Sequence, residues 1–184
     1  MCRNLNKVIV CTDSIEIKRV VEKHGGNCLM TSKKHRTGTD RIAEVAKKLK
    51  GFELIVDIQG DFPMLDPKNI DKLVLFHKKN KFEIVVPSSP LKDGIHKDVV
   101  KLIVNNNNRV MYFSRSEVPF PYLTKAKFYL KHMSIISFNR KSLIKFGKLS
   151  QTYYEKIEGI ELLRAIENDM KVGSFIIKKD IFSV

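Results

Sequence analysis

Strand-length apolar runs alternate with helical patterns, and this alternation restricts the possible folds more than any other feature of the sequence. Four β-rich runs in the first half are separated by three segments with helical periodicity. Parallel strands that are joined through helices produce this order, so it predicts an α/β fold with a doubly wound, mostly parallel sheet. The four runs are KVIVCT (7–12), NCLMT (27–31), FELIVDIQG (52–60) and EIVVPSS (83–89).

Residues at the ends of the helical segments support this assignment. Asp-Ser at 13–14 is a suitable N-cap for a first helix, and Gly-Gly at 25–26 follows its last turn. A second helix is predicted over 39–50, and Asp66-Pro67 begins a third. The run FELIVDIQG is continuously apolar, which is typical of a strand covered on both faces.

The second half has a different character. It favours two strands around the Asn-rich turn at 105–108, one further strand, two helices and a final strand. No repeat or linker divides the chain, so we expect a single domain over 1–184 with a β-rich subregion over 96–140. The segments are 99–115 for the two strands, 127–139 for the next, 142–148 and 153–169 for the helices, and 171–179 for the last strand.

Length and composition limit the class of protein. With 184 residues and 43% hydrophobic residues, the chain is long enough for one good core. No apolar run approaches the roughly 18 residues of a membrane span, and the N-terminus lacks the apolar region of a signal peptide. The three cysteines, Cys2, Cys11 and Cys28, are odd in number and far apart, which indicates a reducing cytoplasm and no disulfide framework.

The net charge of +14 has two interpretations. It could mark a surface for nucleic acid or another polyanion, or it could reflect lysines spread over solvated faces. The lysines occur in scattered pairs, without an arginine-rich tract or a nucleic-acid motif. We therefore expect no nucleic-acid partner, although a nucleotide triphosphate would also be attracted by this charge.

Two predicted strands end in a carboxylate, Asp13 in CTD and Asp61 in QGD, and the loop HRTGTDR (35–41) lies between them. Open α/β sheets bind ligands outside the carboxyl ends of their strands, and a helix N-terminus offers free N–H groups to phosphate. A divalent cation at Asp61 would neutralise phosphate charge. The structural alternatives are that Asp13 caps the first helix, and that Thr39 or Asp40 caps the second with Arg41 on a solvated face.

Three later residues are further candidates. Arg115 directly follows a strand and precedes prolines, where it could bind a carboxylate bidentately or lie on an edge strand as a surface arginine. His132 lies in an apolar strand, where a core histidine is the structural alternative. Glu161 precedes Arg164 by three residues, a spacing that also produces an ordinary ion pair on a helix surface.

Taken together, these stretches resemble the CMP-KDO synthetases, also called 3-deoxy-manno-octulosonate cytidylyltransferases. The matching blocks occur in the family's order and cover almost the whole chain: KVIVCTD, GGNCLMTSKKHRTGTDRIAEV, IVDIQGDFPML, KLIVNNNNRVMYFSRSEVPF, LKHMSIISFNR and YYEKIEGIELLRAIEN. The resemblance implies a Rossmann-like nucleotide-diphospho-sugar transferase fold. It also implies the reaction of CTP with KDO to give CMP-KDO and pyrophosphate for lipopolysaccharide synthesis, in which the anomeric hydroxyl attacks the α-phosphorus with Mg²⁺ neutralising charge.

The resemblance also implies roles for individual residues and an assembly. By position, Asp61 resembles the catalytic magnesium ligand. The nucleotide-side positions are Thr39, Arg41 and Gln59, and the sugar-side positions are Arg115, His132 and Glu161. A homodimer formed through the YFSRSEVPF region is expected as well.

Several departures from the family pattern alter these expectations. The family's PARxxSxRxPGKPL phosphate loop and its C-terminal Val-Asp-Thr-Pro-Glu-Asp-Leu segment have no counterpart in the sequence, so we expect a truncated or divergent member with impaired catalysis. Phe62, Ser134, Ile136 and Leu162 replace glutamate, glycine, tyrosine and glutamine of the family. The alternatives are a cytidylyltransferase for a related keto-sugar acid and a non-catalytic homologue that binds a nucleotide or a protein weakly.

Overall fold

The computed structural model describes residues 2–60 and 65–177. The strands are β1 (Val10–Thr12), β2 (Cys28–Met30), β3 (Leu54–Ile58), β4 (Ile84–Leu91), β5 (Lys101–Val104), β6 (Val110–Ser114), β7 (Tyr129–His132), β8 (Ile135–Asn139) and β9 (Val172–Ile176). The helices are α1 (Ile15–Lys23), α2 (Gly38–Lys48), α3 (Pro67–Lys79), α4 (Arg140–Phe146), α5 (Tyr153–Glu158) and α6 (Leu162–Glu167). Within these two ranges, no helix combines the length and the apolar character needed to cross a bilayer.

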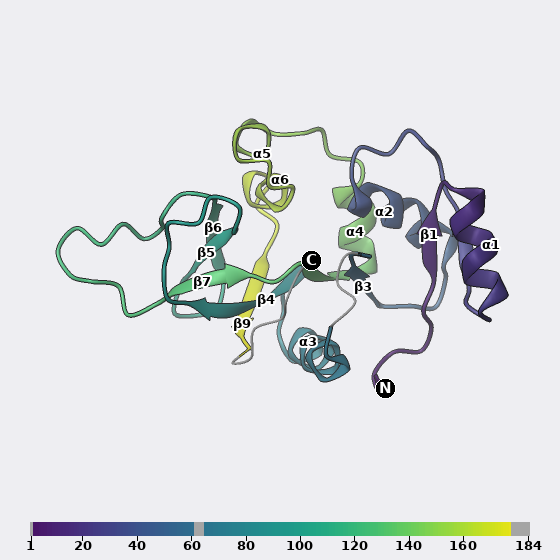
Figure 1. Ribbon diagram of the computed structural model, residues 1–184, viewed down its shortest axis with the longest axis horizontal. Coiled ribbons are helices and arrows are strands. Elements are labelled where there is room, and N and C mark those ends of the chain that lie inside the picture. The colour runs from purple at the N-terminus through teal and green to yellow at the C-terminus, as the bar shows by residue number, and fades with distance from the viewer. Residues whose placement is uncertain (1, 61–64, 178–184) are drawn as a thin grey trace.

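The strands form two sheets (Figure 1). Strands β1 and β2 make a small parallel sheet, while the larger sheet has the order β3-β8-β4-β7-β5-β6, with β9 paired to β4. The α/β class is confirmed, but the predicted mostly parallel pairing is not. Among the described residues, only β1–β2 and β4–β9 pair in parallel. The reason is that β8 runs between β3 and β4, antiparallel to both.

Helices cover both faces of the larger sheet. Figure 1 shows α3 on one side and α4, α5 and α6 on the other. Side chains alternate between these faces along a strand. In β4, Ile84 and Val86 therefore join the core under α2, α4 and α6, while Val85 joins a second core with Leu73 of α3. This two-sided burial explains why β4 is a continuous apolar run in the sequence.

Strand β3 departs from the expectation of burial on both faces. Its residues Leu54, Ile55 and Val56 are only partly buried. The reason is its position, because β3 is the edge strand of the larger sheet and pairs with β8 alone among the described strands. The β1–α1–β2 unit is similarly open, since every residue of α1 is at least partly exposed and Val20 is 58% exposed.

Two predicted elements are interrupted in the structure. The strand predicted over 127–139 is divided into β7, which pairs with β4 and β5, and β8, which pairs with β3 and β4. The helix predicted over 153–169 is divided into α5 and α6 at Gly159, whose φ of 63° ends the first helix. The paired strands around the Asn-rich turn are confirmed as β5 and β6.

Candidate functional site

The first turn of α2 directs two polar side chains into the protein. Thr37 is the N-cap, and its hydroxyl accepts a hydrogen bond from the backbone N–H of Asp40 at 3.1 Å. The alternative that Thr39 or Asp40 caps this helix is therefore wrong. Both residues lie inside the first turn instead and are buried, with Thr39 only 1% exposed. The helix is thus capped by Thr37, two residues before Thr39, and the Thr39 side chain reaches Asp57 of the sheet.

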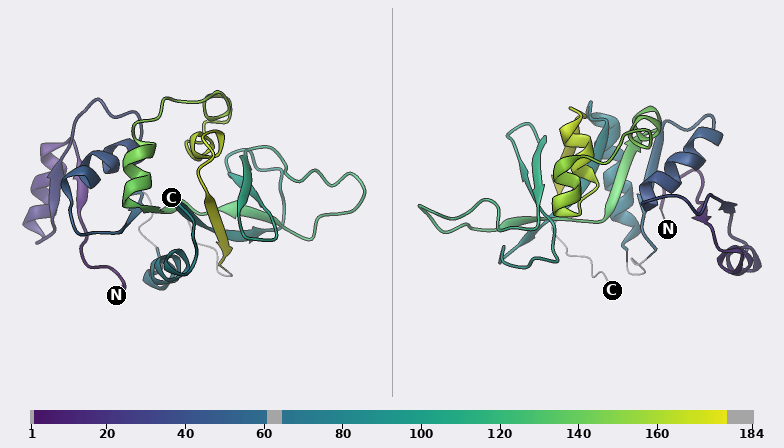
Figure 2. Two further views of the ribbon diagram at one scale, coloured as in Figure 1. Left: turned by 180° about the vertical axis from the view of Figure 1, so that it is seen from behind. Right: turned by 90° about the horizontal axis from the view of Figure 1, so that it is seen from above.

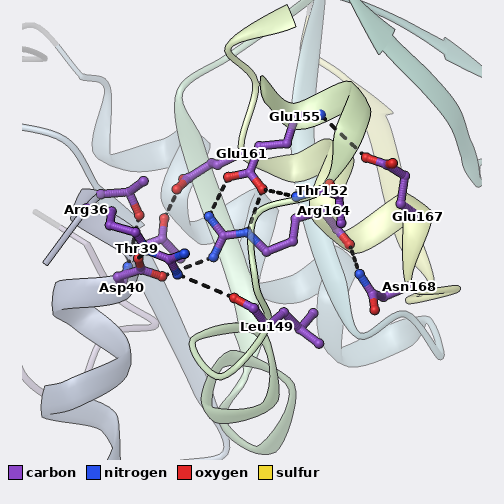
Figure 3. Close-up of polar contacts among 11 residues, drawn as sticks. Arg36, Thr39, Asp40, Leu149, Thr152, Glu155, Glu161, Arg164, Glu167 and Asn168 are labelled. Atoms are coloured by element: carbon purple, nitrogen blue, oxygen red, sulfur yellow. Dashed lines mark hydrogen bonds and ion pairs between the residues drawn. The ribbon is translucent and has the colours of Figure 1, made fainter. Parts of the chain in front are cut away.

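Thr39 joins two carboxyl groups from different elements. Its Oγ1 lies 3.0 Å from Oδ2 of Asp57 in β3 and 2.5 Å from Oε1 of Glu161, which directly precedes α6. Figure 3 shows Thr39 and Glu161 side by side. The sequence singled out Thr39 and Glu161 for different substrates and did not indicate that they touch. Asp57 was missed altogether, although a carboxylate within an apolar strand is an unusual feature that could have drawn attention.

Burial controls the charge of both carboxyl groups. Asp57 is 3% exposed. Burial raises its pKa to about 6, the Thr39 hydroxyl opposes this shift, and the charge of Glu161 adds to it. Burial also raises the pKa of Glu161, against the hydroxyls of Thr39 and Thr37. Glu161 Oε2 is buried and has no hydrogen-bond partner among the described residues.

A buried arginine fixes the helices around this cluster (Figure 3). Arg164 of α6 is fully buried and donates from Nε and Nη2 to both oxygens of Glu155, at 2.9 and 2.5 Å. Its Nη1 lies 3.1 Å from Oδ1 of Asp40, and its guanidinium lies 4.6 Å from the ring centroid of Phe146. Arg164 therefore does not form the helix-surface ion pair with Glu161 that its spacing in the sequence allowed. It links α2, α5 and α6, so it holds Thr39 near Glu161.

Arg41 is also held by the protein. Its Nη2 lies 3.2 Å from Oδ2 of Asp13, and its Nη1 donates to Thr31 Oγ1 at 2.5 Å. This contact lowers the pKa of Asp13. Asp13 is not the helix cap, because Ser14 accepts the hydrogen bond from Ile17 N–H. The strand-end carboxylate and the loop arginine, which were singled out separately in the sequence, are thus brought together.

Arg115 lies just after β6 and reaches the end of α5. Its Nε donates to the backbone carbonyl of Glu158 at 2.9 Å, and its backbone N–H donates to Glu158 Oε2 at the same distance. Its Nη1 is 3.3 Å from the carbonyl of Asp98. The side chain is partly buried rather than lying free on an edge strand. Part of its donor capacity is therefore committed to the backbone.

His132 is packed as a neutral ring. Its imidazole meets Phe113 edge to face, with ring centroids 5.6 Å apart. Burial lowers its pKa to about 4, so the ring carries no charge near neutral pH. Its Nε2 is buried without a hydrogen-bond partner in residues 2–60 and 65–177. The core histidine that the sequence allowed is thus observed, with one ring nitrogen left unsatisfied.

The remaining predicted positions are divided between surface, core and the part of the chain outside the described residues. Gln59 is exposed after β3, whereas Asp61 and Phe62 lie outside the described residues. Ile136 and Leu162 belong to the hydrophobic core, at 3% and 1% exposure. In the described part of the chain, no group of three or more His, Cys, Asp or Glu residues is arranged to hold a metal ion.

Comparisons of this chain with known proteins all indicate the same family. Residues 1–172 match the family model described as cytidylyltransferase. A 3-deoxy-manno-octulosonate cytidylyltransferase of Leptospira interrogans is 35% identical over 184 residues, covering 98% of this chain and 74% of the relative. The enzyme of that name from Fusobacterium nucleatum is 37% identical over 173 residues, covering 92% and 71%. The solved structure of CMP:2-keto-3-deoxy-manno-octonic acid synthetase complexed with CTP is similar to all of this chain and 77% of its own, with a TM-score of 0.95 and 27% identity.

Proposed function

Because this chain belongs to the cytidylyltransferase family, we propose that it transfers the CMP group of CTP to KDO and releases pyrophosphate. The observation that carries this proposal is the match of the whole chain, at a TM-score of 0.95, to a synthetase of this type complexed with CTP. The relatives at 35% and 37% identity share the same name and support the same reaction. The product would serve lipopolysaccharide synthesis.

The proposed sugar side uses buried acceptors that the protein leaves unsatisfied. Glu161 Oε2 and His132 Nε2 lack partners among the described residues. A buried polar atom without a hydrogen bond costs about 1–3 kcal/mol, so a hydroxyl of a bound sugar would relieve this cost. Arg115 is the proposed cation on this side. Its partial commitment to backbone carbonyls would fix the guanidinium in one orientation.

The proposed nucleotide side lies at the N-terminus of α2 and the end of β3. Thr39, Arg41 and Gln59 are its proposed residues, and the first turn of α2 offers N–H groups to a phosphate. Arg41 would have to share its guanidinium between Asp13 and the nucleotide. The net charge of +14 would favour the approach of a triphosphate.

We include Mg²⁺ in the proposal, with Asp61 as its protein ligand. Magnesium in nucleotide sites is held by one or two carboxylates together with phosphate oxygens and water, so a cage of several protein ligands is not required. When bound, the ion would neutralise the phosphate charge.

We also propose a cytoplasmic homodimer. Three large apolar side chains, Phe120, Tyr122 and Leu123, are 71–89% exposed in the loop between β6 and β7. This loop directly follows the YFSR block, and Figures 1 and 2 show that it extends away from the body of the protein. Exposed apolar clusters are typical of protein interfaces. The free thiols of Cys2, Cys11 and Cys28 support a reducing compartment.

The test is pyrophosphate release from CTP and KDO with Mg²⁺, alongside calorimetry with CTP and Mg²⁺. We expect turnover, and we expect Asp61→Ala to abolish it and to weaken CTP binding. Glu53→Gln removes an exposed carboxylate directly before β3 and serves as the matched control. A folded protein that releases no pyrophosphate with any keto-sugar acid would contradict the proposal.

One observation favours a second candidate, a non-catalytic homologue. The guanidinium groups of Arg41 and Arg115 already contact protein groups at 3.2 Å or less, to Asp13 and to the Glu158 carbonyl. If these contacts persist with ligand, the protein would bind CTP without transferring CMP. CTP binding by calorimetry without pyrophosphate release would support this candidate over the enzyme.

A further inference from the structure

The cluster of Thr39, Asp57 and Glu161 contains fewer protons than its contacts require. A threonine hydroxyl has one hydrogen to donate, whereas an ionised carboxylate can only accept. Thr39 Oγ1 is nevertheless within hydrogen-bond distance of a carboxyl oxygen on each side, at 3.0 and 2.5 Å. If both carboxyl groups were ionised, one contact would set oxygen lone pairs against each other. The arrangement is satisfied when one carboxyl group carries a proton and donates it to Thr39.

The surroundings of Asp57 favour such a proton. Asp57 lies directly across from Ile136 of β8, a member of the hydrophobic core. Among the described residues, Asp57 forms no ion pair, and Arg164, which acts on Glu161, binds Glu155 and Asp40. A buried carboxylate without a counter-ion takes up a proton more readily than an exposed one.

The other titratable groups around the cluster add little positive charge to it, and Arg164 acts on Glu161 rather than on Asp57. For Cys11 of β1, burial together with the Asp57 charge raises the pKa of the thiol to about 11, so this group stays neutral. Asp40 of α2 adds negative charge near Glu161, while Arg164 of α6 partly offsets it. Arg164, the cation that acts on Glu161, is thus already bound to Glu155 and Asp40. A proton shared between Asp57 and Glu161 would neutralise part of the remaining negative charge of the cluster.

We propose that Asp57 is a positioning residue, which shares one proton with Glu161 through Thr39 and so holds Glu161 Oε2 as an acceptor for a hydroxyl of the sugar acid. The role toward the sugar rests on the proposed function, whereas the sharing of the proton does not depend on it. The shared proton also removes one negative charge from the place where an anionic sugar acid binds. Loss of the proton at higher pH breaks a Thr39 contact and adds repulsion.

The first experiment uses the protein without substrate, so it does not depend on activity. Thermal unfolding is measured from pH 4 to 8 for the wild type, Asp57→Asn and the control Glu53→Gln. A carboxyl group whose pKa is about 6 in the folded protein and 3.8 when unfolded binds more protons in the folded state between these values. Its contribution to stability is therefore fully present below about pH 4 and is lost as the pH rises to about 6.

We expect Asp57→Asn to remove this loss of stability with rising pH. The melting temperature of the variant should therefore increase, relative to that of the wild type, from pH 4 to pH 7. Glu53→Gln should leave the shape of the wild-type curve unchanged. Thr39→Ser keeps the hydroxyl and should behave as the wild type, whereas Thr39→Val removes the bridge and should change the curve. Parallel curves for the wild type and Asp57→Asn would overturn the inference.

The second experiment measures KM for KDO and kcat against pH. We expect the wild-type KM to rise above pH 6 by up to about tenfold per pH unit, as for loss of one proton, while kcat changes less. In Asp57→Asn the KM should lose this rise, and Thr39→Ser should retain it. A KM profile for Asp57→Asn that follows the wild type would overturn the positioning role. If no variant releases pyrophosphate, the proposed function fails, while the unfolding curves still decide whether the proton is shared.

Discussion

At the scale of single residues, Arg164 shows how the cluster is held in place. Its guanidinium is buried and meets Glu155 with two hydrogen bonds and Asp40 with one. Burying an ion pair costs desolvation energy that the attraction between the charges barely offsets, so its presence alone says little about stability. Removing one partner is different, because the other charges then stay buried and uncompensated. Arg164 therefore fixes the geometry of Thr39 and Glu161 more than it stabilises the fold.

We expect Arg164→Met to lower the free energy of unfolding by about 3–5 kcal/mol, because Glu155 and Asp40 lose their buried counter-ion. Arg36→Met is the matched control, since Arg36 contacts the same Asp40 at 3.0 Å but its side chain is 44% exposed. It should cost less than about 1 kcal/mol. Urea unfolding measures both. Adding Glu155→Gln to Arg164→Met should recover part of the loss, and equal costs for the two arginine variants would contradict this account.

His132 contributes a pH dependence opposite to that of Asp57. Its pKa is lowered from 6.5 to about 4 in the folded protein, so the unfolded chain binds the proton more readily between these values. Stability from this group is present above about pH 6.5 and is lost as the pH falls toward 4, by on the order of 3 kcal/mol. We expect His132→Gln to remove this loss in urea unfolding between pH 4 and 7. His24→Gln, at the exposed C-cap residue of α1, should retain the wild-type slope.

At the scale of elements, the break between α5 and α6 places Glu161. Gly159 adopts φ of 63°, a conformation that residues with a Cβ adopt at a cost. This residue ends α5 and turns the chain, so Glu161 is the N-cap residue of α6 rather than a mid-helix surface residue. Sequence periodicity predicted one helix here because the apolar spacing continues across the break. The glycine between two glutamates was the signal that could have divided it.

Glycine to alanine substitutions at two positions should have opposite effects on stability. A Cβ at Gly159 would meet nothing within 4 Å, so Gly159→Ala is expected to cost about 1–2 kcal/mol from backbone strain alone. Gly38, in the first turn of α2, is equally open but has ordinary helical geometry. Gly38→Ala should therefore stabilise by about 0.5–1 kcal/mol. Chemical denaturation of the two variants measures both, and effects of the same sign would refute the assignment of strain.

The elements themselves were largely predictable. Caps and periodicity are local, and most helices and strands begin and end within a few residues of the predicted bounds. The pairing of strands was less predictable. The first four runs alternate with helices, which correctly indicates that β3 and β4 run in the same direction. The alternation carries no information about β8, which arrives from a distant part of the chain and separates them.

At the scale of the whole molecule, two opposite ends carry exposed apolar side chains. One is the β1–α1–β2 unit, where Ile17 and Val20 are about half exposed, and the other is the loop between β6 and β7. Figure 2 shows this loop extending from the body in both views. Because the loop extends away from the body, it cannot bury its exposed aromatic and leucine side chains against its own chain. A second copy of the chain is the partner that the proposed homodimer supplies.

The paired substitution Tyr122→Ser with Leu123→Ser is expected to shift the protein from dimer to monomer without loss of folding. The two side chains are 85% and 89% exposed, so their removal should cost little in the single chain. Sedimentation velocity measures the shift, and circular dichroism checks the fold. Ile157→Ser, at an exposed position on α5, is the control and should leave association unchanged. Unaltered association of the paired variant would rule out this loop as the interface.

The sequence by itself determined the α/β class, the identity of most elements and the polar motifs at their ends, because each depends on residues within one or two turns or one strand. Only the tertiary structure decided how the strands are ordered and which motifs meet. Thr39 contacts Glu161 across 122 positions, and Arg164 contacts Asp40 across 124. Such contacts depend on how whole elements pack, and no local pattern encodes them. Asp57 became part of the site for the same reason, since its environment is made by α2 and Glu161 rather than by its own strand.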